Sequence, residues 1–226
     1  MTRVGMAVKT ETETTVETAL SAQLREGTRE DHARAESTPF VADLMAGRLD
    51  VAAYADLAAQ QHAVYVALEA AGAALGERGA SVALPALARV PAIESDLARL
   101  WGPAWRDRVD LLPATRRYAE RLREVATTLP GYVAHAYTRY LGDLSGGQII
   151  KRMLARHYGL ADDVLAFYTF DALERIKPFK DEYRARIDAL ELTGDERRAV
   201  VAEARGAFDL NRAVFAELGA RHAPAP

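Results

Sequence analysis

The sequence predicts an all-α fold in a single domain, and three observations support this prediction. Alanine, leucine, arginine and glutamate dominate the chain between its two ends, and these residues lose the least on entering a helix. In the same part of the chain, segments that alternate Val, Ile or Thr with polar residues, as many strands do, are absent. No linker rich in Pro, Gly or Ser divides the 226 residues, a length that permits one domain or two.

Four helices are expected in the first half of the chain. The first ends before Pro39, and a short second helix ends before Gly47. Asp50 has the side chain of an N-cap and opens the third helix, whose apolar residues recur near helical spacing. A loop then precedes the fourth helix. The expected helices span about residues 16–36, 40–45, 50–75 and 86–100.

Four more helices are expected in the second half. Gly102 and Pro103 separate the fifth from the fourth, and Pro130 with Gly131 ends the fifth before the sixth begins. The last opens on Thr193 and Glu196, which have the spacing of a capping box. These helices span about residues 113–129, 132–158, 178–190 and 193–218.

Both chain ends are predicted to be tails around a domain at residues 16–219. Residues 1–15 are polar without an apolar period, which predicts disorder, and residues 220–226 end in alternating Ala and Pro. The start has no apolar stretch of a secretory signal, and no apolar run reaches the roughly 18 residues of a membrane span. A cytoplasmic protein without a membrane segment is therefore expected.

Charge and cysteine content exclude several classes of function. The formal net charge is −3, so the chain as a whole is not built to bind nucleic acid, and any anion site needs a local basic cluster. The chain has no cysteine, which excludes disulfides, zinc–thiolate and iron–sulfur sites, and cysteine nucleophiles. The Glu-x-x-His, His-Glu-x-x-His and Gly-x-Ser-x-Gly motifs of di-iron, zinc-protease and hydrolase sites are also missing.

Three glycines interrupt the sixth expected helix around one carboxylate. Gly142, Gly146 and Gly147 each cost about 1 kcal/mol relative to alanine in a helix interior, so they need a local reason. On a helical wheel they bracket Asp143, which predicts a bare patch of backbone with a carboxylate at its centre. Such a patch lets a bulky, flat ligand approach the backbone. The alternative is that two helices cross closely at these small residues.

His32 is the histidine whose neighbours favour a function. Its helix has an apolar stripe that grades through His32 into Arg25 and Arg29, which predicts an imidazole buried at the edge of a cleft with cations at the mouth. Glu36 follows one turn later, within reach of one ring nitrogen, as the partner of a metal-bound histidine usually is. The alternative is a solvated face with an ordinary His–Glu pair.

A second basic pair, Lys180 and Arg184, is spaced to lie on one helix face, with Lys177 nearby. Such pairs are usually solvated surface residues. Together with the arginines beside His32, they are also suited to hold an anion that carries two carboxylates.

Three stretches of the chain resemble the haem oxygenases. They are residues 24–36, residues 64–69, and residues 135–148, which read His-Ala-Tyr-Thr-Arg-Tyr-Leu-Gly-Asp-Leu-Ser-Gly-Gly-Gln. The resemblance extends over about residues 20–218, and the third stretch is long and highly specific.

The resemblance implies a single helical domain that holds haem between a proximal and a distal helix. It makes His32 the axial iron ligand and Glu36 its hydrogen-bond partner. Arg25 and Arg29 stand where the family often has lysines, so charge is kept there. The implied catalytic residues of the distal side are Asp143, Gly142, Gly146, Gly147, Arg139, Tyr65 and Asn211. The residues implied to contact haem, chiefly its propionates, are Arg25, Arg29, Tyr137, Lys180, Arg184 and Phe208.

The implied reaction uses haem b as both cofactor and substrate. With O2 and electrons it yields biliverdin, carbon monoxide and ferrous iron. The chain has no Rossmann or flavin fingerprint, so a ferredoxin or a flavin- and NAD(P)H-dependent reductase is expected to supply the electrons. A monomer is expected, and the C-terminus lacks the apolar anchor of membrane-bound members.

Three other functions are weighed against this one. A non-enzymatic haem carrier or sensor would need the histidine and the cations but not the glycine patch. A thiaminase-like enzyme has a similar helical fold but uses a cysteine nucleophile, which this chain lacks. An interaction bundle would bind no haem at all.

Overall fold

Ten α-helices make up most of residues 18–222, the part of the chain that the computed structural model describes. Within that range there is no strand, so the all-α prediction is confirmed. The predicted tail 1–15 and the last four residues of the predicted tail 220–226 lie outside the described residues. The helices are α1 (Leu20–Gly27), α2 (Arg29–Glu36), α3 (Pro39–Met45), α4 (Val51–Leu75), α5 (Val90–Trp101), α6 (Pro113–Val125), α7 (Leu129–Gly142), α8 (Gln148–Tyr158), α9 (Ile176–Asp188) and α10 (Gly194–Arg221).

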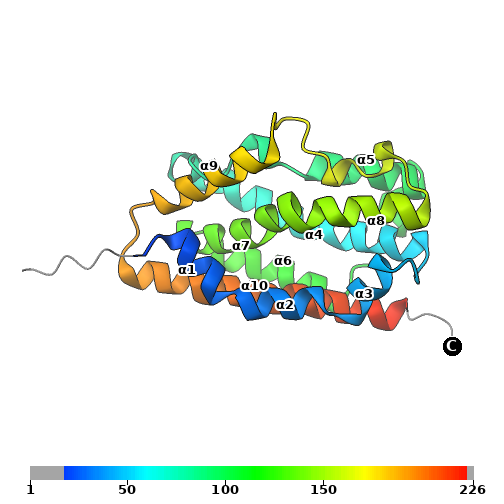
Figure 1. Ribbon diagram of the computed structural model, residues 1–226, viewed down its shortest axis with the longest axis horizontal. Coiled ribbons are helices and arrows are strands. Elements are labelled where there is room, and N and C mark those ends of the chain that lie inside the picture. The colour runs from blue at the N-terminus through cyan, green and yellow to red at the C-terminus, as the bar shows by residue number, and fades with distance from the viewer. Residues whose placement is uncertain (1–17, 223–226) are drawn as a thin grey trace, which may run out of the picture.

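The long helices run in roughly one direction (Figure 1). Helix α10 lies along one side, where it packs against α7, α6 and the three N-terminal helices. Helix α4 runs through the interior and packs against α5, α6 and α7, while α9 lies on the side opposite α10. This arrangement places α2 and the α7–α8 region on the same face of the molecule, which is the face turned toward the viewer in Figure 1.

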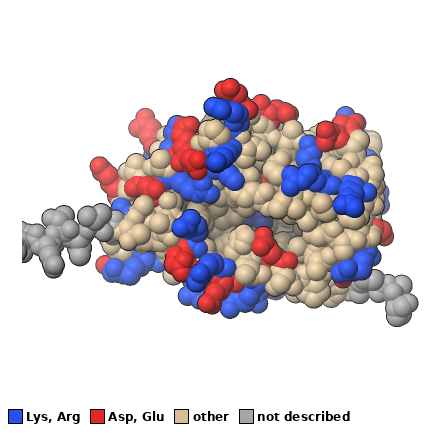
Figure 2. All heavy atoms as spheres, viewed as in Figure 1, with Lys and Arg blue, Asp and Glu red and all other residues tan. Residues whose placement is uncertain are grey.

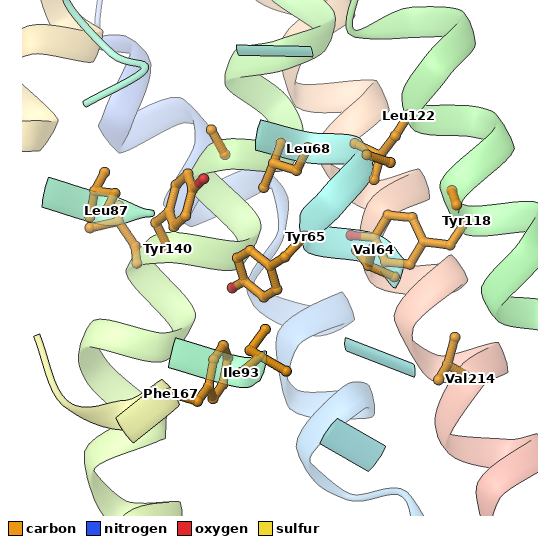
Figure 3. Close-up of a cluster of buried hydrophobic side chains, with 14 of the residues drawn as sticks. Val64, Tyr65, Leu68, Leu87, Ile93, Tyr118, Leu122, Tyr140, Phe167 and Val214 are labelled. Carbon is orange, nitrogen blue, oxygen red and sulfur yellow. The ribbon is translucent and has the colours of Figure 1, made fainter. Parts of the chain in front are cut away.

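Tyr65, in the middle of α4, lies at the centre of the hydrophobic core (Figure 3). Its ring centroid is 5.8 Å from that of Tyr140 and 5.5 Å from that of Phe167. All three side chains are buried. Because neighbours pack around its ring, the direction of the Tyr65 hydroxyl is fixed by the core.

Two predicted helix starts are confirmed by their caps. The side chain of Asp50 accepts a hydrogen bond from the backbone N–H of Ala53, at 2.9 Å, and opens α4. Thr193 and Glu196 form the reciprocal capping box that opens α10. Each cap satisfies backbone N–H groups that the first turn of a helix leaves without a partner.

The predicted helix over residues 16–36 is wrong as a single helix, because it breaks into α1 and α2 at Thr28. The Thr28 hydroxyl donates to the carbonyl of Leu24 at 2.7 Å, a back-bond that bends helices. The break changes the direction of the chain between the two arginines of the predicted cleft mouth, since Arg25 lies on α1 and Arg29 on α2.

The predicted boundary at Pro130 and Gly131 is also wrong. Helix α6 ends at Val125, and α7 begins at Leu129 with both residues inside its first turn. Proline is tolerated there because its missing N–H would have no partner in the helix, and the Thr128 side chain caps the turn. At the other end of the chain, α10 continues past the predicted Leu218 to Arg221.

The predicted helix over residues 132–158 is continuous but contains a π-helix, η4 (Asp143–Gly147). Single π-turns are rare and occur often at functional sites. This one falls on the glycine-rich segment that the sequence marks as unusual. Among residues 18–222, no helix is both long and apolar enough to span a membrane.

Candidate functional site

A cleft opens between α2 and the α7–η4–α8 segment, with α10 contributing to its lining. Figure 2 shows this face hollowed, with Lys and Arg side chains gathered around the hollow. The cleft has two lobes with cavity volumes of about 250 and 130 Å³. His32, Thr138, Gly142 and Phe208 line both lobes, so the lobes form one site.

The imidazole of His32 stands on the α2 wall of the cleft. Its Nδ1 atom lies 3.5 Å from Oε2 of Glu36, which leaves Nε2 free to face a ligand. Its ring meets the buried ring of Phe208 edge-on, with centroids 5.7 Å apart. The expectation that His32 is buried is wrong, because 51% of its side chain is exposed. It lines the open cleft and is packed only on its Phe208 side.

The glycines on the opposite wall divide into two kinds. A Cβ atom at Gly142 or Gly146 would meet no atom within 4 Å beyond its chain neighbours and its own helix backbone. A Cβ at Gly147 would lie 3.0 Å from the ring of Tyr168, in the short 3-10 helix η6 (Ala166–Tyr168). Gly142 and Gly146 therefore form an open backbone patch.

This distinction decides between the two interpretations of the glycines. No helix crosses at Gly142 or Gly146, so close helix packing does not explain them. The Tyr168 ring packs close to Gly147 and leaves little room for a side chain there. Gly147 also lines the inner lobe. The predicted patch of bare backbone therefore includes Gly142 and Gly146 but not Gly147.

Asp143 is buried beside the open patch, with only 8% of its surface exposed. The Tyr65 hydroxyl donates a hydrogen bond to its Oδ2 atom, and this bond joins the distal segment to the core helix α4. Burial raises the pKa of Asp143, while the Arg139 charge and the Tyr65 hydrogen bond oppose the rise. The carboxyl group therefore holds a proton at a higher pH than an exposed aspartate does.

Arg139 extends this cluster to α10. Its NH1 atom donates to Oδ1 of Asn211 at 3.0 Å, and its guanidinium lies 5.0 Å from the centroid of the Tyr65 ring. Burial alone would lower the pKa of Arg139, but Tyr65 and Asp143 raise it further than burial lowers it. Arg139 is thus a fixed cation next to Asp143, and the four predicted polar residues of the distal side lie together.

The outer lobe is the basic one. Arg25, Arg29, Tyr137 and Arg184 line it, drawn from α1, α2, α7 and α9. Burial raises the pKa of Tyr137, and the charges of Arg184 and Arg25 oppose that rise, as expected for one shared cluster.

Lys180 differs from the other predicted cations because it does not line either lobe. Its Nζ atom donates to Oγ of Ser145 at 3.0 Å, from α9 to η4. Ser145 lines the outer lobe, so Lys180 reaches the mouth of the cleft without lining it.

The cleft also contains residues that the sequence did not single out. Thr138 and Ser145 lie within the stretch already marked by its glycines, but nothing in their type distinguished them. Gln61 is one helical turn before Tyr65 on α4, and that spacing was the available signal. The remaining residues of the lining are Thr28, Ala35, Val41, Leu141, Ile150 and Phe215.

Known proteins are similar to this chain in sequence and in fold. Residues 18–217 match the model of the family described as Heme oxygenase. A heme oxygenase of Takifugu rubripes is 38% identical over 93% of this chain and 78% of its own length. Heme oxygenase 1 of Synechocystis is 38% identical over 88% of this chain and 84% of its own length.

Solved structures give the same result. The Synechocystis heme oxygenase-1 in complex with heme superposes with a TM-score of 0.86 at 37% identity, covering 90% of this chain and 93% of that one. The heme oxygenase of Leptospira interrogans has a TM-score of 0.83 at 35% identity, covering 88% and 99%. A TenA homologue from P. horikoshii shares the fold alone, with a TM-score of 0.69 at 14% identity.

Proposed function

The chain belongs to the haem oxygenase family, and from this premise we propose which of its residues hold haem and carry the reaction. The protein is an enzyme that degrades haem. The observation that supports the assignment of residues is one cleft with an open imidazole on one wall and an open glycine backbone beside a buried carboxylate on the other.

The residues of the cleft suit haem on both faces of the macrocycle. His32 has its Nδ1 directed at Glu36, so Nε2 is the atom that binds iron. The space that a Cβ at Gly142 or Gly146 would occupy is open, and a flat porphyrin fills such space without a clash. Phe208 packs beside His32 and adds an apolar edge to the proximal wall.

The charges of the cleft orient the macrocycle. Arg25, Arg29 and Arg184 surround the outer lobe and pair with the two propionates, assisted by the Tyr137 hydroxyl. Lys180, at the mouth beside Ser145, reaches the same carboxylates. The apolar edge of haem then enters the inner lobe, where Val41, Ile150 and Phe215 lie.

Bound haem supplies the iron at which O2 is activated and the porphyrin ring that is opened to biliverdin, carbon monoxide and ferrous iron. The protein supplies position and protons. The backbone of Gly142 and Gly146 would lie against one face of bound haem and limit the space there, which would restrict the orientation of the reactants. Asp143 holds a proton for the reaction and passes it on through water. Its Oδ2 accepts the Tyr65 hydrogen bond, and burial raises the pKa of the carboxyl group above that of an exposed aspartate.

The electrons come from a separate protein, a ferredoxin or a flavin-containing NAD(P)H reductase. Arg25, Arg29 and Arg184 line the outer lobe, and these cations suit an acidic donor that docks near the haem edge. The enzyme acts as a monomer. Its turnover with such a donor slows as salt is added, because salt screens the attraction between the two proteins, whereas turnover with a small-molecule reductant changes little.

Asp143 gives the sharpest test of these assignments. Asp143→Ala retains haem binding but forms biliverdin about 100-fold more slowly, because the positioned proton source is removed. The measurement is product identification after aerobic turnover. Asp56→Asn is the matched control: Asp56 is a buried carboxylate that pairs with Arg221 and His222 outside the cleft, so its loss lowers stability and leaves the rate intact. Biliverdin formation by Asp143→Ala at the rate of the parent chain contradicts the proposal.

A further inference from the structure

One amide in the cleft has no partner. Gln61, on α4, is partly buried and lines the inner lobe. Within residues 18–222 neither its amide nitrogen nor its oxygen makes a hydrogen bond to another residue. The lining of the same lobe includes apolar residues such as Val41, Ile150 and Phe215, and polar residues such as Asp143.

The adjacent residue shows what a structural glutamine looks like in this fold. Gln60 is fully buried, and its amide nitrogen donates to Asp56 at 2.7 Å and to the carbonyl of Asp110 at 3.1 Å. Its amide oxygen accepts from the backbone of Leu112 at 3.0 Å and from Thr115 at 2.7 Å. Packing and hydrogen bonding explain Gln60 completely. They do not explain why its neighbour in the cleft is an amide.

The position of Gln61 on its helix relates it to the distal cluster. Residues four apart lie on one face of an α-helix, so Gln61 is on the same face of α4 as Tyr65. The Tyr65 hydroxyl bonds to Asp143, and Arg139 and Asn211 line the same lobe as Gln61. The amide therefore faces the region in which the reaction's protons are handled.

A ligand in the cleft changes the surroundings of this amide. A flat macrocycle that fills the lobe removes bulk water from Gln61, and a buried amide without a partner is strongly unfavourable. An ordered water meets the requirement, because the lobe offers it several polar partners besides the amide.

We propose that Gln61 is a positioning residue of the haem-degrading site, whose amide holds a water at the inner end of the cleft and links it to Asp143. The inference rests on the proposed function, since it takes the same cleft as the haem site. Gln61 acts through the water and touches neither iron nor oxygen.

The test compares Gln61→Leu with the parent chain in two states. In the haem-free protein the melting temperature is unchanged, because Gln61 has no bond to lose. In the ferric haem complex, the pH midpoint of the change in visible absorbance shifts upward by roughly half a unit, because the deprotonated form of the complex loses the hydrogen bond that the amide-held water would donate. Gln61→Glu shifts the midpoint upward further, because it adds a negative charge.

Two reference variants separate the possible outcomes. Gln60→Leu lowers the melting temperature and leaves the midpoint where it is, which shows that the midpoint does not report general damage to α4. A midpoint that moves in Asp143→Ala but not in Gln61→Leu overturns the role of Gln61 and leaves the proposed function standing. A midpoint that moves in neither variant places the iron elsewhere, and the proposed function then fails as well.

Discussion

His32 and His135 each pair with a glutamate, yet the two pairs occupy different regions of the fold. His32 and Glu36 lie one turn apart on α2, with 51% and 65% of their side chains exposed and 3.5 Å between Nδ1 and Oε2. His135 is fully buried on α7, and its Nε2 lies 3.0 Å from Oε1 of Glu203 on α10. The first pair lines the cleft, whereas the second joins two helices.

The difference shows what separates the proposed haem ligand His32 from a structural histidine. Around His135, the Tyr118 ring packs at 5.6 Å, and the imidazole with Arg121 holds Glu203 in place. The hydrogen bond from His135, together with Arg121, lowers the pKa of Glu203 to about 2, against the effect of burial. His32 lacks such an enclosure and keeps Nε2 accessible, so openness rather than the glutamate partner distinguishes the functional pair.

Replacing His32 or His135 by alanine has the largest expected effects, on haem turnover and on stability respectively. His32→Ala loses the absorbance spectrum of histidine-bound iron and forms no biliverdin, and added imidazole restores part of the turnover. His135→Ala still degrades haem but unfolds with a free energy lower by about 2 kcal/mol, because a buried pair is broken. Full turnover by His32→Ala without imidazole removes His32 from the axial position.

Replacing Glu36 tests whether its pairing with His32 contributes to haem binding. Glu36→Gln weakens haem binding by about tenfold, because Nδ1 loses the carboxylate that orients the ring and raises its basicity. Titration of the haem-free variant with haem measures this change. An affinity equal to that of the parent chain shows that the pair is only a solvated surface contact.

The pH dependence of stability tests the buried pair. The pKa of Glu203 is lowered to about 2 in the folded chain, so the stability it contributes is complete above its ordinary pKa and is lost as pH falls through about 2. Glu203→Gln therefore destabilises the chain by about 1–3 kcal/mol at pH 7, and the difference shrinks below about pH 4. Urea unfolding at a series of pH values measures it. A difference that grows on acidification contradicts the sign.

The distal glycines give the smallest expected effect on stability. Gly146→Ala stabilises the haem-free chain by up to about 1 kcal/mol, because alanine favours helix and its Cβ enters open space. Gly147→Ala destabilises it, because the Cβ meets the Tyr168 ring at 3.0 Å. Thermal unfolding compares the two. Equal shifts for both variants contradict the division of the glycines into open and packed.

The fold was largely predictable because its signals are local. The Asp50 and Thr193 caps place the starts of α4 and α10, and helix-forming composition places most of the other helices. The break at Thr28 and the start of α7 at Leu129 were missed because threonine back-bonding and a tolerated first-turn proline leave no mark on hydrophobic periodicity. The sequence does not predict the π-helix at Asp143. Only the energetic cost of its glycines marks the segment as unusual.

A residue type or a motif marks His32 and Asp143 in the sequence, and the structure places both on the lining of one cleft. Exposure was not predictable, so His32 was expected to be buried and is half-exposed. Gln61 was missed because its role depends on which lobe α4 borders, and that is decided by tertiary packing. Gly147 was grouped with the open glycines because a helical wheel says nothing of Tyr168 on a later segment.

The central claim is that haem lies between His32 and the open backbone of Gly142 and Gly146, and is consumed there. Haem-loaded protein, given a reductant under air and followed by absorbance, tests it most directly. The account predicts that the Soret band disappears while biliverdin accumulates in equal amount, and that His32→Ala does neither. A Soret band that persists in the parent chain through repeated reduction contradicts the account and identifies a carrier or sensor of haem.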